Sequence, residues 1–476
     1  MVIEIANKII IHNPDEEIRE WVRNTFVITN PEYITRVKLN KWLGGTPKYL
    51  RGYAEAGNKI RLPYGTLKDV LYYVRDHYDI NTDITLCTNF NKDTEVDWGD
   101  SCDIIPRPYQ KAAVDHMLGK KFGILKAPCS SGKTVMGHLI AKGTGQRTLW
   151  LTHTKDLLQQ SMAVGELMLG RDKVGTITNG KVNVGKVITY ATIQTIANLS
   201  VDDYKDLFGC VIADEAHHVN TKMQYSRFSR VLNTIPAMYK YGLSATPETF
   251  DGYAQTVIWN LGNIEYEIPK EELEGADLIM PVQIQPVATN WRYPTRAFRA
   301  NGTLDFFEAE RWMYRDERRN QLIVDLIGDK PTIVLSKSIE HLCYIINCLP
   351  EDKWKDTCLV STKHDDSMLN ADINCKHTNK AREEYIQKMR DGKLKYMFST
   401  YALAKEGLNI PCLEQVILAF PPVDPNIITQ SIGRVARVSE GKEQAVCYDL
   451  VDQPRYFKAL YRDRLKLYKK QGYDVL

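Results

Sequence analysis

The sequence predicts an α/β protein in which two doubly wound, parallel-sheet lobes follow a small α+β domain. Three observations support this prediction. The chain has 476 residues, too many for one hydrophobic core. Short, continuously apolar runs alternate with helical patterns, as expected of strands that are buried on both faces of a parallel sheet. These runs form two consecutive series, and a differently patterned region precedes them.

The composition is that of an ordinary globular protein, with 43% hydrophobic and 25% charged residues. The opening MVIEIANKII carries Glu4 and Lys8 and is too short for a membrane span, so it is interpreted as a strand rather than a signal peptide. The ten cysteines include no CxxC pair, which favours reduced thiols. We therefore expect an intracellular, cytoplasmic protein, monomeric and without a membrane partner.

Residues 1–100 are predicted to form the small α+β domain, an accessory region. An apolar run predicts a strand over Val2–Ile11, and Asn13-Pro14 starts a helix that ends near Phe26. A second helix is expected over Thr66–Tyr78, and the polar, acidic segment Asn89–Asp100 is typical of a linker. Seven basic residues against two acidic ones lie between Thr29 and Arg61.

The first lobe is predicted at residues 101–285, the second at 286–452, and a basic helix at 453–476. The strands expected in the first lobe are Gly123–Ala127, Arg147–Thr152, Lys186–Tyr190, Cys210–Ala213 and Lys240–Leu243. Those of the second are Thr332–Leu335, Thr357–Val360, Lys395–Ser399, Gln415–Ala419 and Ala445–Leu450. In the last helix, apolar residues at helical spacing should face the second lobe and the basic residues should face outward.

A phosphate-binding loop is predicted directly after the first strand of the first lobe. The segment Ala127-Pro-Cys-Ser-Ser-Gly132-Lys133-Thr134 leads into a helical run, so backbone N–H groups at the helix start would face an anion. Ser131 and Gly132 would line the loop, Lys133 would reach β and γ oxygens, and Thr134 would ligate Mg²⁺. Ala127 stands where the strict pattern has glycine.

A second candidate element, Asp214-Glu215, ends a predicted buried strand. Strand ends of a doubly wound sheet meet at the ligand-binding edge, so both carboxylates should lie near the phosphate loop. We expect Asp214 to hold Mg²⁺ and Glu215 to deprotonate an attacking water. Two solvated acids at a strand end are the alternative interpretation.

Nine segments in this order resemble the motifs of superfamily-2 helicases, over roughly residues 104–450. In the first lobe they are Arg107–Gln110, Ala127–Thr134, Thr152–Lys155, Thr192–Gln194, Asp214–His217 and Ser244–Thr246. In the second they are Val334–Lys337, Thr400–Pro411 and Gln430–Arg437. The resemblance implies two RecA-like lobes and ATP with Mg²⁺ as cofactors.

The resemblance also implies roles for individual residues. Gln110 would read the adenine or else cap a helix, and Gly407 would lie at the nucleotide. Ser244, Thr246 and His217 would couple hydrolysis to movement. Arg434 and Arg437, taken to share one helix face, would contact the γ-phosphate, with Arg437 as arginine finger and Gln430 beside them. Contacts to nucleic-acid backbone would come from Thr154, Lys155, Thr192, Gln194, Ser336, Lys337 and Thr400.

Among superfamily-2 helicases, the chain most resembles phage UvsW-type enzymes and their RecG- and XPB-like relatives. That implies a DNA helicase or translocase that unwinds or branch-migrates forked DNA in replication, recombination or repair, with proteins of those pathways as partners. Arg36, Lys38, Lys41 and Trp42 in the first domain are candidates to grip DNA. A double-strand translocase, an RNA helicase and an ATP-gated binding switch are the alternatives.

The chain departs from the family pattern at three places. Ser130 stands at a usual glycine of the phosphate loop, and Asn409 at a usual aspartate. The polar stretch Lys363–Asn379 replaces a short turn, and it is either a DNA-touching loop or a disordered insertion.

Overall fold

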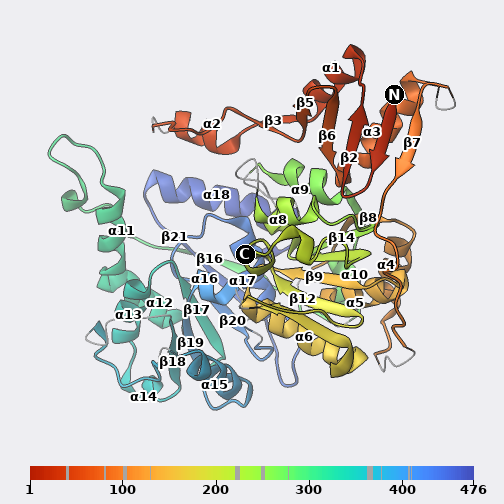
Figure 1. Cartoon of the computed structure of the whole chain (residues 1–476). Coiled ribbons are helices and arrows are strands. Elements are labelled where there is room, and N and C mark those ends of the chain that lie inside the picture. The colour runs from red at the N-terminus through yellow and green to blue at the C-terminus, as the bar shows by residue number, and fades with distance from the viewer. Residues whose placement is uncertain are drawn as a thin grey trace. The chain divides into compact units, whose positions relative to one another are not determined.

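The chain forms two compact units, Met1–Pro269 and Lys270–Leu476, in a computed structural model (Figure 1). The unit boundary precedes the predicted lobe boundary at residue 285, because the strand after it already belongs to the second sheet. Among the residues that the structure describes, no helix is both long and apolar enough to cross a bilayer. The described residues are 1–38, 42–79, 82–99, 104–128, 130–178, 180–219, 226–247, 252–276, 278–361, 368–376, 378–405, 408 and 410–476.

The first unit contains an eight-stranded sheet in the order β11-β10-β12-β9-β13-β14-β8-β15. All neighbours are parallel except the edge pair β10 and β11. The strands are β8 Phe122–Lys126, β9 Thr148–Thr152, β10 Val174–Thr178, β11 Lys181–Asn183, β12 Ile188–Thr192, β13 Cys210–Asp214, β14 Tyr239–Ser244 and β15 Ile264–Glu267. Its helices are α4 Pro108–Leu118, α5 Lys133–Thr144, α6 Lys155–Leu169, α7 Ile193–Ile196, α8 Arg227–Leu232 and α9 Ala254–Leu261. The predicted doubly wound lobe is confirmed.

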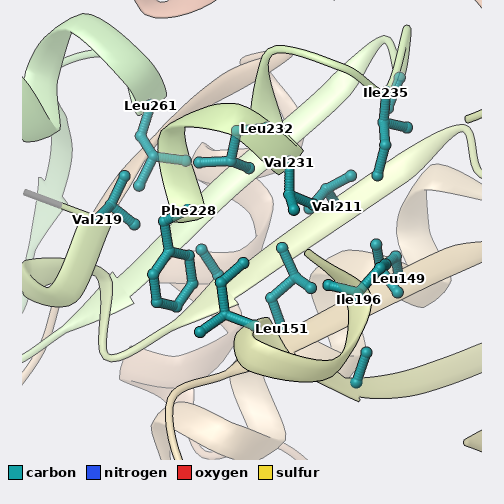
Figure 2. Packing of buried hydrophobic residues seen from close by; sticks show 14 of the residues in the cluster. Leu149, Leu151, Ile196, Val211, Val219, Phe228, Val231, Leu232, Ile235 and Leu261 are labelled. Carbon is teal, nitrogen blue, oxygen red and sulfur yellow. The ribbon is translucent and has the colours of Figure 1, made fainter. Parts of the chain in front are cut away.

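One face of this sheet packs against α7, α8 and α9 through fully buried aliphatic side chains. Figure 2 shows Leu149, Leu151 and Val211 from the sheet against Phe228 and Leu232 from α8. Because these strands are apolar at consecutive positions, both faces of the sheet are covered. This packing fixes the carboxyl ends of the strands, where the predicted site lies.

A second sheet in the first unit, in the order β5-β6-β2-β1-β7, is formed by the N-terminal region. Its strands are β1 Val2–Ile5, β2 Lys8–His12, β5 Ala54–Ala56, β6 Lys59–Pro63 and β7 Thr85–Thr88. The single strand predicted over Val2–Ile11 is wrong, since β1 and β2 form an antiparallel hairpin. The predicted helices are α1 Glu16–Thr25, capped by the Asp15 side chain, and α3 Leu67–His77. The pair β3 Val27–Thr29 and β4 Tyr49–Arg51, with α2 Pro31–Lys38, extends away from this sheet (Figure 1).

The N-terminal sheet shares a core with the eight-stranded lobe. Trp259 of α9 belongs to the hydrophobic cluster of the N-terminal region. A Cβ on Gly52 would come within 2.6 Å of the Trp259 ring, and one on Gly65 within 2.4 Å of the Gly262 backbone N. Side chains at both positions would push the two sheets apart, so these glycines are required by the close approach.

Lys240 on β14 is a buried cation at this shared core. Its Nζ donates to the carbonyls of Leu232, at 2.7 Å, and Asn7, at 3.2 Å. It also lies 5.0 Å from the centre of the Tyr64 ring. Burial lowers the pKa of Lys240 from 10.5 to about 7. Between pH 7 and 10.5 the folded protein therefore binds fewer protons at Lys240 than the unfolded chain does.

We expect Lys240→Met to reduce the pH dependence of stability. Between pH 7 and 10.5 the unfolded chain holds the extra proton, so this group makes the unfolding free energy of the wild type rise with pH. The slope from one proton is at most about 1.4 kcal/mol per pH unit. Urea unfolding at several pH values in this window measures it, with the exposed Lys121→Met as control. Equal slopes for all three proteins would contradict the prediction.

The prediction of a linker over Asn89–Asp100 is wrong for its described residues, because they are bound along the first lobe. The Asn91 side chain donates to the carbonyls of Lys205, at 2.8 Å, and Phe208, at 2.9 Å. Trp98 is 4% exposed and donates to the carbonyl of Gln146. These specific bonds outweigh the polar composition that suggested a free connection.

The second unit contains a seven-stranded, wholly parallel sheet in the order β18-β19-β17-β20-β21-β16-β22. The strands are β16 Gln283–Ala288, β17 Thr332–Ser336, β18 Thr357–Val360, β19 Tyr396–Thr400, β20 Gln415–Leu418, β21 Val446–Val451 and β22 Asp474–Val475. The helices are α10 Lys270–Gly275, α11 Phe306–Tyr314, α12 Glu317–Leu326, α13 Ile339–Asn347, α14 Glu351–Trp354, α15 Asn379–Arg390, α16 Tyr401–Lys405, α17 Pro425–Val435 and α18 Arg455–Lys470. The second doubly wound lobe is therefore confirmed as well.

The C-terminal helix α18 corrects one part of the sequence interpretation. Phe457 and Tyr468 are buried, as the helical spacing predicted. Arg464, however, is also buried and binds Asp449 of β21 through two hydrogen bonds of 2.8 Å. The basic residues of this helix therefore do not all face outward, because one is neutralised inside the fold.

The inserted stretch Lys363–Asn379 lies partly outside the described residues. Within its described part, Met368, Ala371 and Ile373 join the hydrophobic core of the second lobe. The backbone N of Leu359 on β18 donates to the Asn374 carbonyl at 2.9 Å. Residues 368–376 therefore pack against the edge of the lobe.

Candidate functional site

The predicted phosphate loop joins β8 to α5 with two residues in the left-handed backbone region. Ser130 has a φ of 70° and Gly132 a φ of 79°. Such a conformation turns successive N–H groups toward one side and forms a concavity suited to an anion. The Lys133 Nζ donates to the carbonyls of Ala127 and Pro128, both at 3.2 Å. The lysine therefore folds back over the loop from the first residue of α5.

Gln110 and Tyr109 of α4 hold this loop from the side. The Gln110 Nε2 donates to the Ser131 carbonyl at 3.0 Å, and the Tyr109 hydroxyl donates to the same oxygen at 2.8 Å. The Gln110 Oε1 accepts from the Arg107 backbone N, so this residue also caps its helix. A Cβ on Gly132 would lie 2.4 Å from the Gln110 Nε2, so glycine is required there.

The left-handed conformation of Ser130 leads to a testable expectation. Such a backbone costs an ordinary residue about 1–2 kcal/mol and glycine almost nothing. We expect Ser130→Gly to retain nucleotide hydrolysis, whereas Ser130→Val should lower it, because β-branched residues are outliers at positive φ. Turnover assays on purified variants check this, with Ser200→Val as control because Ser200 has a φ of −61°. A fully active Ser130→Val would contradict the role of the loop conformation.

The predicted acidic pair lies at the same sheet edge as the loop. Strands β13, β14 and β8 are neighbours, with Asp214 opposite Leu243 and Ser244 opposite Lys126. Glu215 has a φ of 50°, a strained conformation for a non-glycine residue, of a kind that clusters at active sites. Its backbone N donates to the Asp214 Oδ1 at 2.9 Å.

The pKa values of the two carboxyl groups are shifted in opposite directions. Burial, and then the charge of Glu215, raise the pKa of Asp214 above its ordinary value. Burial also acts to raise the pKa of Glu215, but the hydrogen bond of His217 and the charge of Lys133 outweigh it, and the pKa falls below its ordinary value. Lys133 acts on both groups, so the loop lysine and the acidic pair belong to one site. Opposed shifts of this kind are typical of catalytic pairs.

His217, Ser244 and Thr246 form a buried cluster beside the acidic pair. The His217 Nδ1 lies 3.3 Å from the Glu215 Oε2 and 3.2 Å from the Ser244 Oγ. The Thr246 backbone N donates to the Ser244 Oγ, and the Ser244 carbonyl accepts from the Ala127 backbone N. A continuous chain of contacts therefore links Glu215 to the phosphate loop through β14.

The candidate phosphate contacts of the first lobe gather at the same edge, after β9 and β12. Thr154 caps α6 by accepting from the Leu157 backbone N, and Lys155 next to it is exposed. Thr192 is only 4% exposed and hydrogen-bonds Thr195, while the Gln194 Nε2 donates to the His153 carbonyl at 2.9 Å. Lys155 is therefore the more available of these groups for a ligand.

The two arginines of the second unit are not arranged as predicted. Helix α17 ends at Val435, so Arg437 lies beyond it, in an isolated bridge with Ile279, and shares no helix face with Arg434. The Arg434 guanidinium donates to the carbonyls of Leu408 and Ala404. The spacing of three suggested one helix, but the helix ends between them.

The remaining second-unit candidates lie at the carboxyl edge of the second sheet. Gln430 is 9% exposed, and its Oε1 is buried without a hydrogen-bond partner among the described residues. Ser336 is fully buried and hydrogen-bonds His341 at 2.9 Å, whereas Lys337 is exposed and pairs with Glu310 at 2.8 Å. Thr400 lies opposite Ser336 on β19. Gly407 and Asn409 lie outside the described residues.

In the N-terminal region, the DNA candidates lie on α2 and after it. Trp42 is 85% exposed, and its carbonyl accepts from the Arg36 guanidinium at 2.9 Å. Arg36 also pairs with Glu32, which neutralises part of its charge. Lys41 and the side chain of Lys38 lie outside the described part of the chain.

Two site residues had no signal in the sequence. Ser161 of α6 donates to the Asp214 Oδ2 at 3.2 Å, although it is 53 positions away in the chain. His218 stacks on His153, with ring centres 4.3 Å apart. Only the parallel sheet brings these segments together, and no local pattern marks them.

The comparisons with known proteins match helicase families and relatives. Residues 103–249 match the family described as type III restriction enzyme, res subunit, and residues 319–439 match the helicase conserved C-terminal domain. A protein of Acanthamoeba polyphaga mimivirus, provisionally named an ATP-dependent RNA helicase, is 26% identical over 99% of this chain and 85% of its own length. The structure of Saccharomyces cerevisiae Dbp5 bound to RNA and ADP BeF3 covers 78% of this chain and 90% of that chain, with 17% identity and a TM-score of 0.51.

Two further relatives carry helicase or translocase names. The DNA 3'-5' translocase XPB2 of Sulfurisphaera tokodaii is 25% identical over 72% of this chain and 81% of that protein. A protein named as a helicase in Escherichia phage T5 is 24% identical over 72% of this chain and 71% of its own length. The two family models match the two lobes in the predicted order, and together with these relatives they identify the chain as an ATP-dependent helicase of superfamily 2, related to XPB and phage helicases.

Proposed function

We propose that this helicase uses ATP with Mg²⁺ to unwind or branch-migrate forked and branched DNA. One observation supports the ATP chemistry: the phosphate loop and the acidic pair share one site, in which the charge of Lys133 acts on both carboxyl groups. The DNA assignment is supported by the XPB2 and phage relatives. The mimivirus relative makes an RNA helicase the second candidate.

The nucleotide would be bound by groups of the first lobe. The Lys133 ammonium would exchange its two loop carbonyls for β and γ oxygens, which are stronger acceptors because they are charged. Glu215, ionised and next to His217, would accept the proton of the attacking water. Gln110 holds the loop with its amide, and a contact to adenine would add to that role.

The residues present fit a magnesium ion. Asp214 is a buried carboxylate whose charge is opposed by Glu215, and Thr134 begins the helix next to Lys133 with a hydroxyl oxygen. Hard oxygen donors of this kind suit Mg²⁺, which usually needs only one or two protein ligands besides phosphate and water. Accordingly, no group of three or more His, Cys, Asp or Glu is required, and the described residues contain none. Bound there, the ion would neutralise charge on the phosphates.

We assign the γ-phosphate contacts of the second unit to Arg434, Arg437 and Gln430 on the resemblance. The buried Oε1 of Gln430, which has no hydrogen-bond partner among the described residues, supports this assignment, because such an atom is costly unless it gains a donor. Ser244, Thr246 and His217 would couple hydrolysis to movement, and their contacts with Glu215 and the loop support that role.

The choice of DNA structure rests on the N-terminal region. Trp42 is exposed on an extension of the first unit and would stack on an unpaired base at a fork. Backbone contacts of the lobes, with Lys155 and Lys337 the more exposed, would be independent of sequence. A double-strand translocase would need no such aromatic group.

The deciding experiment compares ATP hydrolysis with single-stranded DNA, duplex, fork, four-way junction and RNA. We expect the strongest stimulation by the branched DNAs, and loss of this preference in Trp42→Ala. The Lys133→Ala variant should bind no nucleotide and serves as the negative control for ATP hydrolysis. Stimulation by RNA alone would overturn the DNA assignment and leave the helicase assignment intact.

A further inference from the structure

A basic pocket lies between the N-terminal sheet and the eight-stranded lobe of the first unit. Its volume is about 350 Å³, within the ~300–1,000 Å³ typical of ligand sites. Lys8 of β2, Arg51 of β4, Arg61 of β6 and Arg230 of α8 line it, and no Asp or Glu is among its lining residues. Tyr53 and Trp259 add aromatic surface. Four cations around one cavity are unusual for a surface hollow with no function.

The charge of these residues is not compensated by the fold. Among the described residues, Lys8, Arg51 and Arg61 form no ion pair, in contrast to Arg19 and Arg23 nearby, which share Glu55. Burial, and then the charge of Arg61, lower the pKa of Lys8, and the charge of Glu4 only partly opposes them. Two mutually repelling cations in a half-buried cavity cost free energy unless an anion joins them.

The backbone holds these groups in fixed positions. Arg61 faces Ile10 of β2 and Ala54 of β5, so it lies in the middle of the N-terminal sheet and next to the strand of Lys8. Gly52, between Arg51 and Tyr53, is pressed against the Trp259 ring. On the lobe side, Asn233, Ser229 and Asn260 are tied together by hydrogen bonds of 2.7 to 3.2 Å. The pocket is therefore preorganised by both sheets.

We propose that this pocket binds a phosphate group of the nucleic-acid strand on which the helicase acts. Its four cations suit the negatively charged oxygens of a phosphate group, and the aromatic surface suits the attached sugar or base. The pocket would anchor the nucleic-acid strand to the first unit, away from the carboxyl ends of the β-strands, where the ATP site lies. This inference rests on nucleic-acid binding and not on the choice of branched DNA. A free phosphate compound has the same chemistry and is a second source to test.

The test measures binding of a labelled single-stranded oligonucleotide at several salt concentrations. Lys8→Gln with Arg61→Gln is the pocket variant, and Arg51→Gln with Arg230→Gln is a second one that changes only exposed side chains. Arg75→Gln with Lys92→Gln removes the same charge elsewhere in the N-terminal region and is the control. Loss of the bound phosphate should reduce the slope of log affinity against log salt by about 0.7, the value for one phosphate of a single strand.

We expect this slope change in both pocket variants and not in the control, with ATP hydrolysis in the absence of nucleic acid unchanged in all of them. A parallel arm adds inorganic phosphate or AMP and follows thermal unfolding. Stabilisation of the wild type, absent in the pocket variants, would assign the site to a free phosphate compound. Salt slopes equal to the control, with no phosphate-dependent stabilisation, would overturn the inference. The DNA panel above is scored separately, so its failure is distinguishable.

Discussion

Glu215→Gln is expected to retain ATP binding and to lose turnover by a factor of roughly 10²–10⁴, the contribution of general-base catalysis. The amide has nearly the same shape as the carboxylate but cannot accept a proton from water. Because the pKa of Glu215 is lowered by its neighbours, the wild-type side chain is ionised across the neutral range. Steady-state hydrolysis with saturating nucleic acid, together with binding of a fluorescent ATP analogue, measures both quantities.

The control for this prediction is Glu272→Gln, an exposed residue of α10. The strained φ of 50° at position 215 should persist in the variant, because it is set by the strand end and by the bond from its backbone N to Asp214. A circular dichroism spectrum equal to the wild type would show that the fold is intact. Turnover at the wild-type rate would remove Glu215 from the proton transfer and leave the acidic pair without its proposed role.

Five strands of each lobe could be predicted from the sequence because they are buried on both faces, whereas β10, β11, β15, β16 and β22 were not predicted. The run Cys210–Ala213 is apolar at every position and Thr357–Val360 at all but the first, and their ends agree with the structure within one residue. The same logic placed Asp214 and Lys133 at one edge, since parallel strands align their carboxyl ends. The parallel order of the strands thus predicted where most of the candidate site lies.

What could not be predicted depends on contacts between distant segments. Only the family pattern, which usually has glycine at this position, pointed to the left-handed φ of Ser130, because serine itself does not favour that conformation. Asn91 is polar and Trp98 is an isolated aromatic residue in the sequence, yet both donate hydrogen bonds to carbonyls of the first lobe. The end of α17 before Arg437 is set by the bridge to Ile279, more than 150 positions earlier. Local periodicity contains none of this information.

A buried ion pair that local patterns cannot detect leads to the second large expected effect. Arg464→Ala should destabilise the second unit by about 3–5 kcal/mol, the usual result of leaving one buried charge without its partner. Arg464 and Asp449 have side chains that are 2% and 0% exposed, and two hydrogen bonds of 2.8 Å join them. The Tyr468 hydroxyl donates to the same carboxylate at 2.8 Å. Denaturant unfolding followed by tryptophan fluorescence measures the change.

Arg462→Ala is the matched control, because Arg462 lies on the same helix and is exposed. It should change the unfolding free energy by no more than about 0.5 kcal/mol, as is usual for surface positions. The double variant Asp449→Asn with Arg464→Met should recover part of the loss, because it removes the second charge as well. If Arg464→Ala instead weakened only nucleic-acid binding, Arg464 would belong to an outward-facing basic surface, as the helical pattern alone had predicted. The bidentate contact to a fully buried carboxylate argues for stability, since a side chain held inside the lobe is not available to a phosphate on the surface.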